Sequence, residues 1–180
     1  LTSVHFPPRS LNHPFDYSNQ FLRAVTPCDI AILLATGAAS SNLDSNYAMF
    51  AAHKPGESTM GTTHKVTGGN GTELSVYECG NPEGRSILFI HGFCQSLLAW
   101  KYQFNSALAD EFRLVALDLR GHGMSAKPTD PMNYTDGQYW ADDIAAIIRE
   151  LKLDKPTLVA WSYGGYVMCD YLLRYGHGGV

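Results

Sequence analysis

The stretch TLVAWSYGGY, Thr157–Tyr166, decides the fold predicted from this sequence. A short apolar run ends at Ser162, and two glycines follow. A sharp turn from a strand into a helix needs small residues two positions before and after its central residue, here Ala160 and Gly164. Gly165 is expected to give further room where the helix meets the strand. The pattern predicts a strained turn that exposes the Ser162 hydroxyl, although small residues also flank serines at strand ends by chance.

The composition is that of a globular protein. The chain has 180 residues, enough for one domain with a substantial core, and is 45% hydrophobic and 17% charged. A net charge of -4 without a basic patch argues against a nucleic-acid-binding protein. No CxxC pair or Cys/His cluster suggests a metal site, and free thiols are expected at the four scattered cysteines, Cys28, Cys79, Cys94 and Cys169.

Residues 1–59 contain five prolines and no clear periodicity, which predicts a poorly ordered or non-native segment. The apolar run at residues 30–40 leaves open a signal peptide and a secreted or periplasmic protein; otherwise a cytoplasmic location is expected. The run is too short to cross a bilayer, so no membrane span is expected. A third interpretation is that translation starts at Met49 or Met60.

Strand signals become clear from Met60 onward. Two β-type runs around Gly-Gly-Asn-Gly predict a hairpin over residues 64–78. Three continuous apolar runs, at residues 86–92, 112–118 and 157–161, are typical of strands buried on both faces of a parallel sheet.

Helical patterns separate these runs, at residues 95–111 and 139–153. The second has its apolar residues on one face, and Thr135 with Gln138 forms a capping-box pattern before it. Residues 163–176 are apolar nearly all round, which predicts a buried helix. Alternating strands and helices predict the α/β class, with a doubly wound, mostly parallel sheet.

Two further stretches accompany the serine turn. FIHGFCQS, at residues 89–96, follows the first central strand, and LDLRGHGMSAKP, at residues 117–128, follows the second. In the latter, Asp118 and Arg120 are expected to brace a tight turn through hydrogen bonds and an ion pair. His91 and His122 are interpreted as structural residues rather than proton carriers.

Together the three stretches resemble the α/β-hydrolase fold family over about residues 65–176, in both order and spacing. The sequence is most similar to the branch of non-haem haloperoxidases, perhydrolases and arylesterases. The resemblance implies that Ser162 is the nucleophile and that the backbone N–H groups of Phe93 and Tyr163 form the oxyanion hole. It also implies that Trp161, where the family usually has phenylalanine or a similar bulky residue, lines the acyl pocket. Ala160 replaces the usual glycine.

A serine at this turn suits acyl transfer, whereas the resemblance assigns an aspartate there to haloalkane dehalogenases and epoxide hydrolases. In this family a catalytic acid follows the serine in the chain, and a catalytic histidine follows the acid. The sequence after Ser162 contains one histidine, His177, which the predicted helix would place roughly 20 Å from the serine. Asp170 lies on the same helix. We therefore expect the base and acid beyond Val180, and residues 60–180 to be the N-terminal part of the hydrolase domain, inactive on its own.

The leading hypothesis is a serine hydrolase that cleaves a small-molecule ester or similar acyl substrate through an acyl-enzyme on Ser162. The alternatives are a cofactor-free haloperoxidase or perhydrolase, and a binding protein that keeps the fold without turnover. No Walker loop, GxGxxG or metal cluster is present in the sequence, so no cofactor or metal is expected. The sequence leaves the oligomeric state open.

Overall fold

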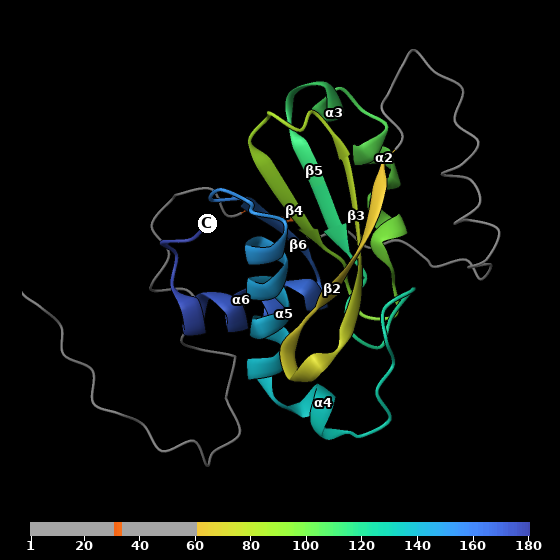
Figure 1. Ribbon diagram of the computed structural model, residues 1–180, viewed down its shortest axis with the longest axis vertical. Helices are drawn as coiled ribbons and strands as arrows, with labels where there is room; N and C mark the ends of the chain where they lie inside the picture. The colour runs from red at the N-terminus through yellow and green to blue at the C-terminus, as the bar shows by residue number, and fades with distance from the viewer. Residues whose placement is uncertain (1–30, 34–60) are drawn as a thin grey trace, which may run out of the picture.

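The computed structural model describes residues 31–33 and 61–180, which build a six-stranded mixed sheet covered by helices (Figure 1). The strand order is β1-β6-β4-β5-β3-β2. The strands β1, β6, β4 and β5 run parallel, and β3 and β2 form an antiparallel hairpin beside β5. The predicted α/β class with a mostly parallel sheet is confirmed. The strands are β1 (Ala31–Leu33), β2 (Thr62–Thr67), β3 (Glu73–Gly80), β4 (Ser86–Ile90), β5 (Arg113–Leu117) and β6 (Thr157–Trp161).

The segment 1–59 is described only at strand β1, which pairs in parallel with β6 so that Ala31 lies opposite Val159. The rest of that segment, with most of the run at residues 30–40 and Met49, lies outside the described residues. The predictions made for it therefore stay predictions. Within the described part of the chain, no helix is long and apolar enough to span a membrane.

The strands β4 and β5 are buried on both faces, as their continuous apolar runs predicted, whereas β6 is buried on one face and half-buried on the other. Leu88 and Ile90 of β4 join the core under the long helices, whereas Phe89 between them joins a second cluster on the opposite face. The first face is covered by α5 (Gly137–Glu150) and α6 (Tyr163–Tyr175). The other face is covered by the 3-10 helix η4 (Leu97–Trp100) and α2 (Lys101–Phe104).

The segment predicted as one helix at residues 95–111 is instead broken into η4, α2 and α3 (Leu108–Glu111). The side chains of Asn105 and Ser106 bond to the carbonyls of Lys101 and Gln103. Such local bonds compete with the helical ladder and explain the break.

Two further helix predictions need correction. Thr135 does not cap α5 but ends the short helix α4 (Met132–Thr135); the cap is Asp136, whose side chain accepts the Gln138 N–H. Helix α6 is buried along one face only. Val167, on the side that faces the sheet, is buried, whereas Leu173 is 73% exposed.

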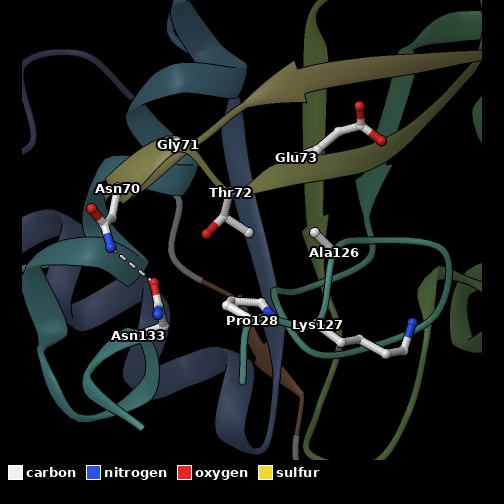
Figure 2. Close-up of a pocket in the computed structure, with 8 residues that line it drawn as sticks. All are labelled: Asn70, Gly71, Thr72, Glu73, Ala126, Lys127, Pro128 and Asn133. Atoms are coloured by element: carbon white, nitrogen blue, oxygen red, sulfur yellow. Dashed lines mark hydrogen bonds between the residues drawn. The ribbon is translucent and has the colours of Figure 1, made fainter. Parts of the chain in front are cut away.

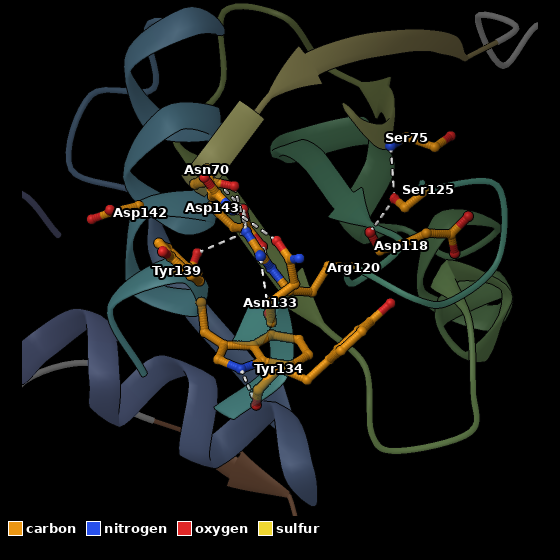
Figure 3. A network of polar contacts seen from close by, with 12 residues as sticks. Asn70, Ser75, Asp118, Arg120, Ser125, Asn133, Tyr134, Tyr139, Asp142 and Asp143 are labelled. Atoms are coloured by element: carbon orange, nitrogen blue, oxygen red, sulfur yellow. Dashed lines mark hydrogen bonds and ion pairs between the residues drawn. The ribbon is translucent and has the colours of Figure 1, made fainter. Parts of the chain in front are cut away.

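A fully buried ion pair joins α5 to the loop after β5 (Figure 3). Arg120 donates through Nε and Nη2 to the two carboxylate oxygens of Asp143, both at 2.7 Å. The same guanidinium donates to the carbonyls of Gly69, in the hairpin turn η3 (Gly69–Gly71), and of Asn133. The predicted pairing of Arg120 with Asp118 is therefore wrong.

Burial raises the pKa of the Asp143 carboxyl, and this shift is opposed by the two bonds from Arg120 and by the Gly69 N–H at 2.8 Å. The hairpin approaches so closely that a Cβ at Gly68 would lie 2.1 Å from an Asp143 oxygen. One buried pair thus fixes the hairpin turn, α5 and the loop after β5 relative to one another.

Replacing Asp143 with leucine is expected to destabilise the protein by about 3–5 kcal/mol, because Arg120 would be left buried without a counter-charge. The double variant Arg120→Met/Asp143→Leu should recover only part of this loss, because it removes the unpaired charge but leaves the carbonyls of Gly69 and Asn133 without their donor. Urea unfolding monitored by circular dichroism measures both effects. The matched control is Glu73→Gln in the exposed pair with Lys65 (3.0 Å), which should cost less than about 1 kcal/mol. A loss at Asp143 no larger than the control would contradict the assigned role.

Candidate active site

The site predicted from the sequence lies at the carboxyl ends of β4, β5 and β6. The chain leaves β4 toward η4 on one face of the sheet, and leaves the adjacent β6 toward α6 on the other face. In open α/β sheets, such a reversal between neighbouring strands opens a crevice at the strand ends, where ligands bind.

The turn between β6 and α6 has the strained geometry that the sequence predicted. Ser162 has φ 51° and ψ -116°, a conformation that non-glycine residues rarely adopt, and it is exposed. Ala160 is fully buried. A Cβ on Gly164 would lie 2.4 Å from the Ile90 carbonyl oxygen. The start of α6 therefore packs directly on the backbone at the end of β4, which leaves no room for a side chain.

Gly165 does not have the role predicted for it. A Cβ at this position would meet nothing within 4 Å, so the absence of a side chain is not needed for packing. The close approach of helix and strand is made at Gly164 alone.

Trp161 and Gly92 lie beside the serine. A Cβ on Gly92 would be 2.6 Å from the Trp161 ring and 3.2 Å from the Ser162 Cβ, so this glycine is required for the loop after β4 to pass the turn. Trp161 is half-buried and packs against the cluster that contains Phe89 and covers the η4 face. Its part in an acyl pocket stays a prediction.

The structure brings together the two residues that the sequence named as oxyanion-hole donors. The Phe93 and Tyr163 rings meet edge to face, with their centroids 6.0 Å apart. Tyr163 is the first residue of α6, so its backbone N–H lies at the helix N-terminus, where the helix dipole favours negative charge. The Phe93 side chain is 67% exposed.

His91 is held by backbone groups and is unsuited to carry a proton. It is fully buried; its Nδ1–H donates to the Gly92 carbonyl at 2.7 Å, and its Nε2 accepts the Leu119 N–H at 3.0 Å. Burial lowers the pKa of His91 to about 4. This agrees with the structural role predicted from the sequence.

His122 is also engaged, through Nδ1 with the Arg120 carbonyl and through Nε2 with the Cys94 N–H. His64 on β2 lies 2.8 Å from Glu78, and His177 follows the far end of α6. Among residues 61–180, no histidine is hydrogen-bonded to Ser162, and no group of three or more His, Cys, Asp or Glu side chains is arranged to hold a metal.

Two supporting residues were missed by the sequence analysis or given the wrong role. Gln95 Oε1 accepts the Gly92 N–H at 3.0 Å. Asp118, fully buried, accepts the N–H groups of Leu97 and Met124, both at 2.8 Å, and so ties the loop after β4 to its own loop. An aspartate at the end of a buried strand was the available signal, because such a carboxylate must find donors nearby.

A surface hollow of about 470 Å³ lies away from these residues, between the hairpin turn and the loop after β5 (Figure 2). Ser162, Phe93 and Tyr163 take no part in its lining. The hollow is lined by Asn70, Gly71, Thr72, Glu73, Ala126, Lys127, Pro128 and Asn133.

Comparison with protein families matches residues 85–178 to the α/β hydrolase fold, and the chain belongs to this family. Among solved structures it is similar to a presumed aryl esterase from Burkholderia cenocepacia, at 47% identity and a TM-score of 0.65. It is also similar to the esterase RhEst1 from Rhodococcus sp. ECU1013, at 38% identity and a TM-score of 0.61. A non-heme haloperoxidase of Rhodococcus erythropolis is 35% identical over 115 residues.

The match covers 66% of this chain for each of the two structures and 64% for the haloperoxidase. It spans 44%, 42% and 40% of those proteins respectively, which is less than half of each. Esterases and haloperoxidases, the branch that the sequence resembles, are thus among the relatives, and so are epoxide hydrolases, such as VrEH1 from Vigna radiata at 32% identity and a TM-score of 0.59.

Because the two glycines of the turn are packed differently, they should differ in their tolerance of a side chain. Gly164→Ala should destabilise the protein by about 2–3 kcal/mol, because the new methyl group would press on backbone that cannot yield. Gly165→Ala, one residue further along, should be neutral or stabilising by up to about 1 kcal/mol, since its methyl group meets open space. Thermal unfolding of the two variants tests this; equal destabilisation would show that the turn is not packed as described.

The buried His91 predicts acid sensitivity. Its pKa in the fold, about 4, lies below the ordinary value of 6.5, so the neutral ring is favoured by folding. The stability it contributes is complete above pH 6.5 and falls by up to about 3 kcal/mol as the pH drops toward 4. The variant His91→Asn lacks this titrating group, so its unfolding free energy should not show this loss at low pH. The difference in unfolding free energy between the unaltered protein and the variant should therefore narrow on acidification. A gap that stays constant from pH 7 to pH 4 would refute the assignment.

Proposed function

We propose that this protein is a serine hydrolase that cleaves esters through an acyl-enzyme on Ser162. The single observation that carries the proposal is the positive-φ turn at Ser162, held between β6 and α6 by the contact of Gly164 with the end of β4. Backbone strain of this kind, at an exposed hydroxyl, is a feature of functional sites.

In the proposed reaction, the Ser162 Oγ attacks the ester carbonyl and forms a tetrahedral intermediate. Its oxygen becomes negative and is received by the backbone N–H groups of Phe93 and Tyr163. The alcohol then leaves, and water releases the acyl group from the serine. In this proposal the base that takes the serine proton lies outside the described residues. In support, His91 and His122 are committed to backbone partners, His64 pairs with Glu78, and His177 follows the far end of α6.

The proposed substrate is a small molecule with an apolar acyl group. Support comes from the aromatic side chains beside Ser162, namely the exposed Phe93 and the half-buried Trp161, and from the esterases among the relatives. The residue at the centre of the turn distinguishes this protein from its epoxide hydrolase relatives. Ser162 lies where the family resemblance assigns an aspartate to those enzymes.

A second candidate function is that of a perhydrolase, favoured by the similarity to a non-heme haloperoxidase. The acyl-enzyme on Ser162 would be the same. Hydrogen peroxide would then replace water, and the acyl group would leave as a peracid while the serine regains its proton. Release of peracid from an ester in the presence of peroxide, compared with simple hydrolysis, separates the two activities.

The test is labelling of the full-length protein with a fluorophosphonate probe, followed by peptide mass spectrometry. We expect one adduct, on Ser162, because the turn exposes its hydroxyl beside the oxyanion donors. Ser162→Ala should abolish both the adduct and the hydrolysis of p-nitrophenyl acetate. Labelling at another residue, or turnover that survives in Ser162→Ala, would disprove the proposal.

A further inference from the structure

The loop from β4 to η4, residues 91–96, carries Phe93 at its middle and is anchored at both ends. Gly92 donates its N–H to the Gln95 side chain, and the Gln95 N–H returns to the Gly92 carbonyl at 3.3 Å. Beyond the loop, the Leu97 N–H is held by Asp118. His91 Nδ1 also bonds the Gly92 carbonyl, at 2.7 Å. Because this carbonyl and the Phe93 N–H belong to one planar peptide, these bonds hold the peptide before Phe93, but none of them reaches the peptide that follows it.

That peptide is held by His122. Its Nδ1–H donates to the Arg120 carbonyl at 2.9 Å, which leaves the lone pair on Nε2 to accept the Cys94 N–H at 3.2 Å. The ring also meets the Phe93 ring edge to face, with centroids 5.9 Å apart. Cys94 has φ 56°, so the loop passes through a disfavoured conformation at the residue that His122 bonds.

We propose that His122 is a positioning residue for the oxyanion hole: by holding the Cys94 N–H, it fixes the second of the two peptides that flank Phe93 and so completes the support of the Phe93 N–H. The first peptide, which carries that N–H, is held through its Gly92 carbonyl by His91 and the Gln95 N–H. With both peptides held, neither torsion at the Phe93 Cα is free to drift. Oxyanion donors act through preorganised geometry, and small displacements of such groups slow catalysis strongly. This inference rests on the proposed function, because it assigns Phe93 to the oxyanion hole.

His91 has a different role, and its hydrogen bond runs in the opposite direction between the same two loops. His91 belongs to the loop after β4 and accepts an N–H from Leu119 in the loop after β5. His122 belongs to the loop after β5 and accepts an N–H from the loop after β4. His91 is fully buried at the base of the loops, whereas His122 is half-buried and lies at the level of Phe93.

Two substitutions test the role of the Nε2 acceptor of His122 apart from that of the rest of the ring. In His122→Gln, the amide oxygen reaches the position of Nε2 and can still accept the Cys94 N–H. In His122→Asn, the shorter side chain keeps a donor near the Arg120 carbonyl and presents nothing to Cys94. A third variant, His122→Leu, keeps bulk without any acceptor and serves if the Asn protein fails to fold.

The first measurement is amide hydrogen exchange by nuclear magnetic resonance on the full-length protein. Loss of the acceptor should speed exchange at Cys94 by about tenfold or more in His122→Asn, and much less in His122→Gln. The Gly69 amide, which is bonded to Asp143, is the internal control and should be unchanged. Unchanged exchange at Cys94 in the Asn and Leu variants would overturn the inference.

The second measurement is steady-state hydrolysis of p-nitrophenyl acetate. In His122→Asn, kcat should fall by about tenfold while KM stays within about twofold, because the oxyanion forms only after binding. His122→Gln should keep kcat within about threefold. Equal losses in the Gln and Asn variants would also overturn the inference. Failure of the proposed function is recognised separately, as turnover that survives in Ser162→Ala.

Discussion

The buried pair of Arg120 and Asp143 is the interaction on which the arrangement of this molecule depends. It joins the loop after β5 to α5, and through the Gly69 carbonyl it joins both to the hairpin turn (Figure 3). A buried charge pair costs desolvation and is weak evidence for stability by itself. Its value here is geometric, because the guanidinium has five donors in a fixed plane and bonds the carbonyls of Gly69, Asn133 and Tyr139 from three segments at once.

The same pair reaches the candidate site through a short chain of contacts. Arg120 presents its carbonyl to His122, and His122 holds the Cys94 N–H beside Phe93. The loops after β4 and β5 are therefore not independent flexible segments. They are linked by three hydrogen bonds, made by His91, His122 and the carboxylate of Asp118. In each bond a side chain from one loop accepts a backbone N–H from the segment that begins at the other strand.

Much of this could be predicted from the sequence, since the signals were local. The hairpin, the buried strands and the turn at Ser162 follow from residue spacing over about ten residues. The partner of Arg120 could not be predicted, because Asp143 lies 23 residues away and the nearer Asp118 was an equally charged choice. The breaks at Asn105 and Ser106 and the open space at Gly165 depend on contacts that periodicity does not record.

The strain at Ser162 and the strain at Cys94 are held by different means, and this difference follows from what each residue must do. The serine turn is locked by backbone packing, Gly164 against the carbonyl of Ile90, which leaves the Ser162 hydroxyl exposed. The Cys94 conformation is held by a side chain, because the Cys94 N–H has its partner in His122 of the neighbouring loop. Under the proposed function this arrangement has a reason: a loop that offers the Phe93 N–H to a substrate cannot also spend that N–H in a backbone ladder, and side chains that hold the adjacent peptides leave it available.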